Sequence, residues 1–271
     1  RMNNWLIALI TTFLFAISPW LPKAQAASKL PIVRIAIVRD GPEVRLPDQT
    51  GVAKEEILRV TAGQFDVRFP AEMMVHGNWN SAEIKKVIDK LLADPRVDLI
   101  IGAGYIASNY LGQLRDLPKP AIAAVLLDRE LQRFPLKDGG SGVKNLSYID
   151  PFVSIGRDIK VFYEMVPFNN LAVLTSNLAL ENIPWFEKRL REIANEYTIN
   201  LTVVEVRTSA NEALAALPPE TDAVYVMPLA QLSPGEFRKL IYGIILRRLP
   251  SFSTLGREDV EAGLLASVRP K

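Results

Sequence analysis

The sequence of 271 residues contains no cysteine and only one histidine, His76. Without cysteine the chain has neither a disulfide framework nor a thiol nucleophile, and a single imidazole cannot complete a zinc site of the usual nitrogen and sulfur ligands. Neither a P-loop nor the Gly-x-Ser-x-Gly turn of the hydrolases occurs. We therefore expect no enzymatic activity, no metal and no cofactor, and a fold that depends on its hydrophobic core.

Charge of one sign is not concentrated anywhere in the chain. The 32 basic residues balance 30 acidic ones, for a formal net charge of +2. Arg1 and Lys23 are the only charged residues up to position 26, so the remainder carries no net charge. A neutral chain without a basic run has no electrostatic attraction for nucleic acid or for anionic membranes. We therefore expect no nucleic-acid partner.

The first 26 residues have the pattern of a secretory signal. A positively charged start is followed by the apolar stretch 5–20, which is shorter than the roughly 20 residues that a spanning helix needs. The small-residue pattern Ala24-Gln25-Ala26 then forms a cleavage site of the A-x-A kind. We expect cleavage near Ala26. With no cysteine there to carry a lipid anchor, we expect a soluble periplasmic protein.

After the signal, apolar strand patterns alternate with helix patterns. This alternation occurs in two runs, which are separated by the loop-rich stretch 128–150. The strands predicted in the first run are 31–38, 65–69, 97–101 and 120–127, and those in the second are 171–175, 201–206, 223–227, 249–253 and 264–268. Apolar strands separated by helices predict parallel sheets covered by helices on both faces. The fold class is therefore α/β with two Rossmann-like lobes. We place the first lobe at 31–150, the inter-lobe crossing at 151–168 and the second lobe at 169–268.

Four segments resemble a known family. They are 97–102 (VDLIIG) with the strand at 120–127, 169–175 (NNLAVLT), 221–226 (TDAVYV) before Pro228, and 249–253 (LPSFS) with the downstream segments 259–260 and 263–266. In order and spacing they resemble the ABC transporter substrate-binding proteins of the type I periplasmic binding protein fold, and within it the branch for tryptophan and other amino acids. The resemblance spans about residues 31–268. Such proteins continue beyond the last strand with a segment that returns to the first lobe, whereas this sequence stops at Lys271. A C-terminal truncation is therefore predicted.

The resemblance implies a monomeric periplasmic solute-binding protein. Its ligand would be a small organic molecule, an amino acid or similar, and its partner an ABC permease in the inner membrane. The same fold could instead serve a ligand sensor or an accessory protein of an envelope export system, because a fold does not determine a function. An enzyme with its site in the same cleft is the third alternative.

In sheets of this kind ligands bind beyond the carboxyl ends of the strands, so the residues that follow the strands are the candidate ligand-binding residues. Each candidate group also has a structural interpretation: a tight turn for residues 102–105, a helix cap for 175–177, a turn cap for Asp128 and loop packing for residues 227, 228 and 253. In the loop at residues 102–105 the family usually places a threonine and often a proline. The groups are Gly102, Ala103, Gly104 and Tyr105; Thr175, Ser176 and Asn177; Asp128; and Met227, Pro228 and Ser253. Asp40 and Gly41, after the first strand, face the same edge.

Overall fold

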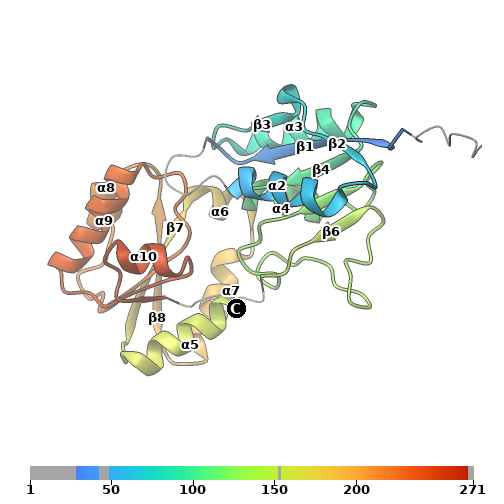
Figure 1. The fold of residues 1–271 in the computed structure, drawn as a ribbon. Coiled ribbons are helices and arrows are strands. Elements are labelled where there is room, and N and C mark those ends of the chain that lie inside the picture. The colour runs from blue at the N-terminus through green and yellow to red at the C-terminus, as the bar shows by residue number, and fades with distance from the viewer. Residues whose placement is uncertain (1–28, 43–48, 152–153, 268–271) are drawn as a thin grey trace, which may run out of the picture.

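The computed structural model describes residues 29–42, 49–151 and 154–267, so the predicted signal segment 1–26 lies outside the described residues. Two lobes lie side by side, and each contains a sheet with helices packed against it (Figure 1). The sheets are separate and every strand pairing in them is parallel. The predicted α/β class with two parallel-sheet lobes is confirmed.

The first lobe contains a sheet of six strands in the order β2-β1-β4-β5-β6, with β3 also paired to β1. β2 pairs with the beginning of β1 and β3 pairs with its end, so both lie on the same side of β1. The strands are β1 (Ile32–Arg39), β2 (Asp66–Arg68), β3 (Met74–His76), β4 (Leu99–Gly102), β5 (Ala121–Ala123) and β6 (Leu146–Tyr148).

The second lobe contains a sheet of five strands in the order β11-β10-β9-β7-β8. In both lobes the first strand has neighbours on both sides, so the order of the strands reverses there: between β1 and β4 in the first lobe and between β7 and β9 in the second. The strands are β7 (Asn170–Ser176), β8 (Asn200–Val206), β9 (Ala223–Val226), β10 (Ser251–Ser253) and β11 (Ala266–Ser267).

Several helices begin at side chains that cap their free N–H groups. Asn80 accepts from the N–H of Glu83 at 3.1 Å before α3, and Ser233 accepts from that of Glu236 at 3.2 Å before α9. The helices are α2 (Gln49–Thr61), η1 (Ala71–Met73), α3 (Ser81–Ala93), α4 (Tyr105–Gln113), α5 (Ile155–Met165), α6 (Asn177–Asn182), α7 (Phe186–Asn195), α8 (Ala210–Ala215), α9 (Pro234–Leu246) and α10 (Arg257–Glu261).

The two lobes share one continuous apolar core. The largest cluster of buried side chains runs from Ala36 and Ile106 in the first lobe to Leu178, Phe186 and Tyr225 in the second. α5, in the segment predicted to cross between lobes, packs on the second lobe: the ring of Phe162 lies 5.2 Å from that of Phe252. The structure therefore places α5 with the second lobe.

Some elements differ from the sequence prediction. β5 ends at Ala123 although the apolar run continues to Leu127, and β6 and β3 fall in stretches without strand periodicity. Val125, within that apolar run, is exposed. Three-residue strands are too short to show alternation, so their pairing with neighbouring strands decides their conformation. The first sheet accordingly has six strands where the patterns indicate four, whereas the second has the five that they indicate.

Candidate functional site

The carboxyl ends of both sheets meet at the lobe junction. α4, which follows β4, packs against α6, which follows β7, and α6 lies between the lobes in Figure 1. β1 and β4 flank the point where strand order reverses in the first sheet, and β7 and β9 do so in the second. In open parallel sheets ligands bind at such points. Two of the predicted residue groups, 102–105 and 175–177, are therefore brought together from opposite lobes.

Asp40, at the end of β1, occupies the N-terminus of α4. Its carboxylate accepts the N–H of Ile106 at 3.0 Å and that of Ala107 at 2.9 Å. A carboxylate from within the chain therefore occupies the helix N–H groups that could otherwise bind a ligand carboxylate. Burial raises the pKa of Asp40 to about 6, although the N–H donors act in the opposite direction.

The turn from β4 to α4 is shaped around this carboxylate. Gly102 is buried, and its carbonyl accepts the hydroxyl of Ser108 at 2.9 Å. Ala103 donates its N–H to Val38 at 2.8 Å, which fixes the turn against β1. At Gly104 a Cβ atom would lie 2.3 Å from Cγ of Asp40. Gly104 therefore lets the carboxylate approach the start of the helix.

Two hydroxyls at the junction are buried without a hydrogen-bond partner in the described part of the chain. The Tyr105 hydroxyl lies beside the side chain of Ser176, but no partner meets it at hydrogen-bond geometry. The Thr175 hydroxyl at the end of β7 is also unpaired, and this side chain is 1% exposed. Burial raises the pKa of Tyr105 above its ordinary value, so it stays protonated. Buried polar groups are nearly always satisfied by protein, water or a ligand.

The other two residues of the second-lobe group are engaged locally. Ser176 accepts the N–H of Leu178 at 3.2 Å and caps α6, as the structural interpretation of this group has it. The side-chain amide of Asn177 donates to Glu181 at 3.0 Å. Of this group, Thr175 therefore keeps its hydroxyl available.

Polar side chains that the sequence analysis missed join the lobes directly. Asn109 of α4 donates to the carbonyl of Asn182 at 3.0 Å, and the side-chain amide of Asn182 donates to the hydroxyl of Ser81 at 2.6 Å. Asn109 and Asn182 are both buried. An asparagine in the mostly apolar α4 is the signal that could have identified this contact, because a buried amide needs a partner.

Asp128 lies at the junction but is fully engaged. One oxygen accepts the N–H of Leu131 at 2.8 Å and the other that of Ile155 at 3.0 Å. It therefore caps both the turn after β5 and the start of α5. These bonds agree with the structural interpretation of Asp128 as a turn cap.

The remaining predicted residues lie at the ends of β9 and β10. Met227 is 2% exposed within the apolar core, and Pro228 is half-buried. The Ser253 hydroxyl donates to Asp259 and accepts the N–H of Leu255 at 3.0 Å. Their ligand-binding role stays a prediction.

A strained loop borders the end of β1. Asn78 and Trp79 have φ angles of 53° and 57°, which bulky side chains rarely adopt. The indole of Trp79 covers Gly41, where a Cβ atom would lie 2.1 Å from the ring. Backbone strain of this kind clusters at functional sites. The loop also leads to Ser81, which contacts the second lobe.

The described residues show no cluster of three or more metal-ligating side chains. Among those same residues, no helix is long and apolar enough to cross a membrane.

Solved structures from other proteins have the same architecture. No protein-family model and no curated protein matches the sequence. A conserved domain protein from Vibrio cholerae is similar with a TM-score of 0.65 at 14% identity, over 87% of this chain and 78% of that one. An ABC domain in complex with L-Trp from Streptococcus pneumoniae gives 0.61 at 16%, over 87% and 79%. A type 1 periplasmic binding protein from Bordetella pertussis gives 0.56 at 14%, over 86% and 66%. The fold is that of the type I periplasmic binding proteins.

Proposed function

We propose that this protein is a periplasmic solute-binding protein of an ABC importer, without enzymatic activity. It would hold a small organic ligand between its lobes and deliver it to a permease in the inner membrane. The fold supports this proposal, since its solved examples include an ABC domain in complex with L-Trp and a leucine-binding protein from Thermotoga maritima. An amino acid or a similar molecule is therefore the first ligand to test.

One observation carries the proposal. The hydroxyls of Tyr105 and Thr175 come from opposite lobes, lie at the carboxyl ends of β4 and β7 and have no partner among the described residues. An unpaired buried hydroxyl costs about 1 to 3 kcal/mol, and a ligand that bonds it removes this cost. A ligand that bonds both hydroxyls also joins the lobes.

Closure follows from the same arrangement. A ligand that contacts both lobes binds the closed state more tightly than the open state and therefore shifts the population toward closure. The bonds from Asn109 to Asn182 and from Asn182 to Ser81 already connect the lobes. These bonds would limit how far the lobes separate in the unliganded protein, and therefore how far they have to move on closure.

Calorimetric titration of the processed protein, beginning at Ala27, tests the proposal. Amino acids, organic acids, purines and sugars form the panel. We expect one-site binding of a single metabolite and a raised melting temperature. Failure across the whole panel would contradict the importer role and favour a sensor or export accessory, and turnover of the bound molecule would indicate an enzyme.

Removing the two hydroxyls tests the site itself. We expect Tyr105→Phe and Thr175→Val each to weaken binding of that metabolite about fivefold, since a hydrogen bond contributes about 1 kcal/mol. The unliganded variants should be as stable as the parent or more so, because an unpaired buried hydroxyl is lost. Tyr242→Phe is the control, as the Tyr242 side chain is 62% exposed on α9. Unchanged affinity in both site variants would place the ligand elsewhere.

A further inference from the structure

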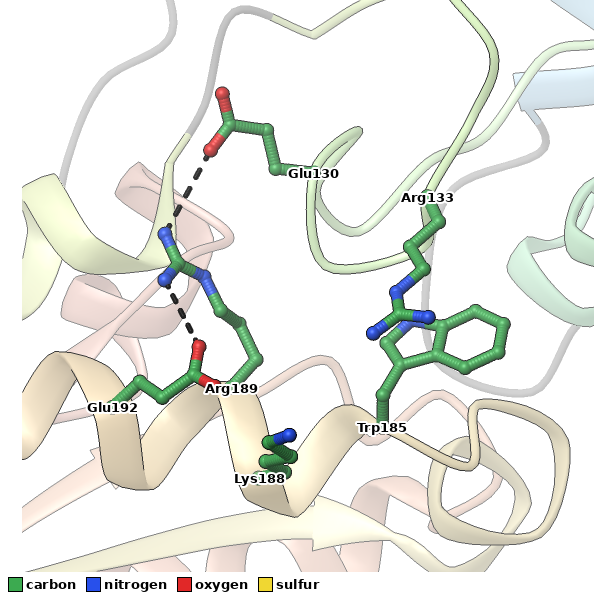
Figure 2. A pocket seen from close by; sticks show the side chains of 6 residues that line it. All are labelled: Glu130, Arg133, Trp185, Lys188, Arg189 and Glu192. Carbon is green, nitrogen blue, oxygen red and sulfur yellow. Dashed lines mark hydrogen bonds and ion pairs between the residues drawn. The ribbon is translucent and has the colours of Figure 1, made fainter.

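A charged groove lies at a separate part of the lobe junction. It is lined from the first lobe by the loop after β5 and from the second lobe by the start of α7 (Figure 2). The groove is small and partly open to solvent, so only a small group fits. The lining residues are Glu130, Arg133, Trp185, Lys188, Arg189 and Glu192.

Arg189 is neutralised by both acidic side chains of the groove. Its guanidinium lies 3.8 Å from the carboxylate of Glu130 and 3.2 Å from that of Glu192 (Figure 2). Glu130 also pairs with Arg129 at 3.4 Å. The negative charge of the groove is therefore already engaged by arginines.

The two other cations of the groove have no carboxylate partner in the described part of the chain. The guanidinium of Arg133 lies over the Trp185 ring, 4.4 Å from its centroid, and Lys188 on α7 lines the same groove (Figure 2). The indole N–H of Trp185 donates to the carbonyl of Leu131, which fixes the ring between the lobes. A guanidinium stacked on a ring keeps its edge N–H groups free to bind an anion.

We propose that this groove binds a small oxyanion, a phosphate or carboxylate group, between Arg133 and Lys188. The fork of Arg133 matches two oxygens of such a group, and the ammonium of Lys188 supplies a second charge. Arg133 belongs to the first lobe and Lys188 to the second, so the bound anion joins the lobes. Its effect on affinity for the metabolite rests on the proposed function, whereas binding of the anion itself does not.

Thermal unfolding of the processed protein in inorganic phosphate at constant ionic strength tests the groove. Phosphate at ten times its dissociation constant should raise the melting temperature by about 3 °C. Succinate as a second probe separates carboxylate from phosphate recognition. No shift with either probe, or the same shift with sodium chloride alone, would overturn the proposal.

Matched variants assign the effect to the groove. Arg133→Gln and Lys188→Gln should each remove most of the shift, and Lys188→Gln leaves the stacking of Arg133 on Trp185 in place. Lys144→Gln, which changes an exposed lysine elsewhere, should keep the full shift. Glu130→Gln should strengthen anion binding about threefold, because it removes a negative charge from the rim. A full shift in both cation variants would contradict the assignment.

Discussion

Replacing Gly104 with alanine lowers the free energy of unfolding by about 3 kcal/mol, because the new Cβ would collide with Asp40. The Cβ would lie 2.3 Å from both Cγ and Oδ1 of that residue. The carboxyl cannot move aside freely, since its oxygens accept the N–H groups of Ile106 and Ala107. The φ of Gly104 is −144°, an extended value that alanine adopts, so the cost comes from the collision alone.

Gly156→Ala is the matched control, to be compared with Gly104→Ala by urea denaturation. Gly156 lies in α5, and its Cβ would meet the nearest atom at an ordinary 3.6 Å. Alanine there should leave stability unchanged or raise it by up to about 1 kcal/mol. The Asp40→Ala background should reduce the cost of Gly104→Ala, because the colliding group is gone. Equal costs for both glycines would contradict this description of the turn.

Lowering the pH from 7 to 4.5 raises the free energy of unfolding by about 2 kcal/mol for each of two buried carboxyls. Burial raises the pKa of Asp40 to about 6 and that of Asp158 to about 6, from 3.8. Between those values the folded state binds more protons than the unfolded state. The stabilisation that these two carboxyls contribute is therefore present at low pH and is lost as the pH rises through 6.

Asp158 is fully buried on α5 and accepts the Tyr225 hydroxyl at 3.1 Å. The pKa of Asp94 is lowered to about 2 by Arg96, so it stays ionised across this range and does not contribute to the change. Urea denaturation at several pH values measures the slope. Asp40→Asn should remove about half of it, and Asp158→Asn the other half. A slope that neither variant alters would show that other groups produce it.

Local patterns determined most of the fold. The apolar stripe after Asn80 gives α3 with Ile84, Ile88, Leu91 and Leu92 buried, and Ser233 caps α9. These features depend on residues within a few positions of one another, so one segment of sequence contains them completely. The same holds for β1, β7 and β9, whose apolar strands are buried in the sheets.

The site was predicted less well because its contacts join distant segments. The candidate groups at 102–105 and 175–177 lie at the contact of α4 with α6, and their ligand-binding role stays a prediction. That Asp40 would occupy the start of α4, 66 residues away, could not be read from either segment. The same is true of the bond from Asn109 to Asn182. Such pairings depend on how the lobes pack, and no local period encodes that.

The absence of native cysteine allows a direct test of closure by spin labels on Lys90→Cys and Arg238→Cys. These exposed positions lie on α3 and α9, one in each lobe. Electron spin resonance then measures the distance between lobes with and without the metabolite identified by calorimetry. Closure around a ligand predicts that saturation shifts this distance distribution and narrows it to one population. An identical distribution in both samples would contradict closure.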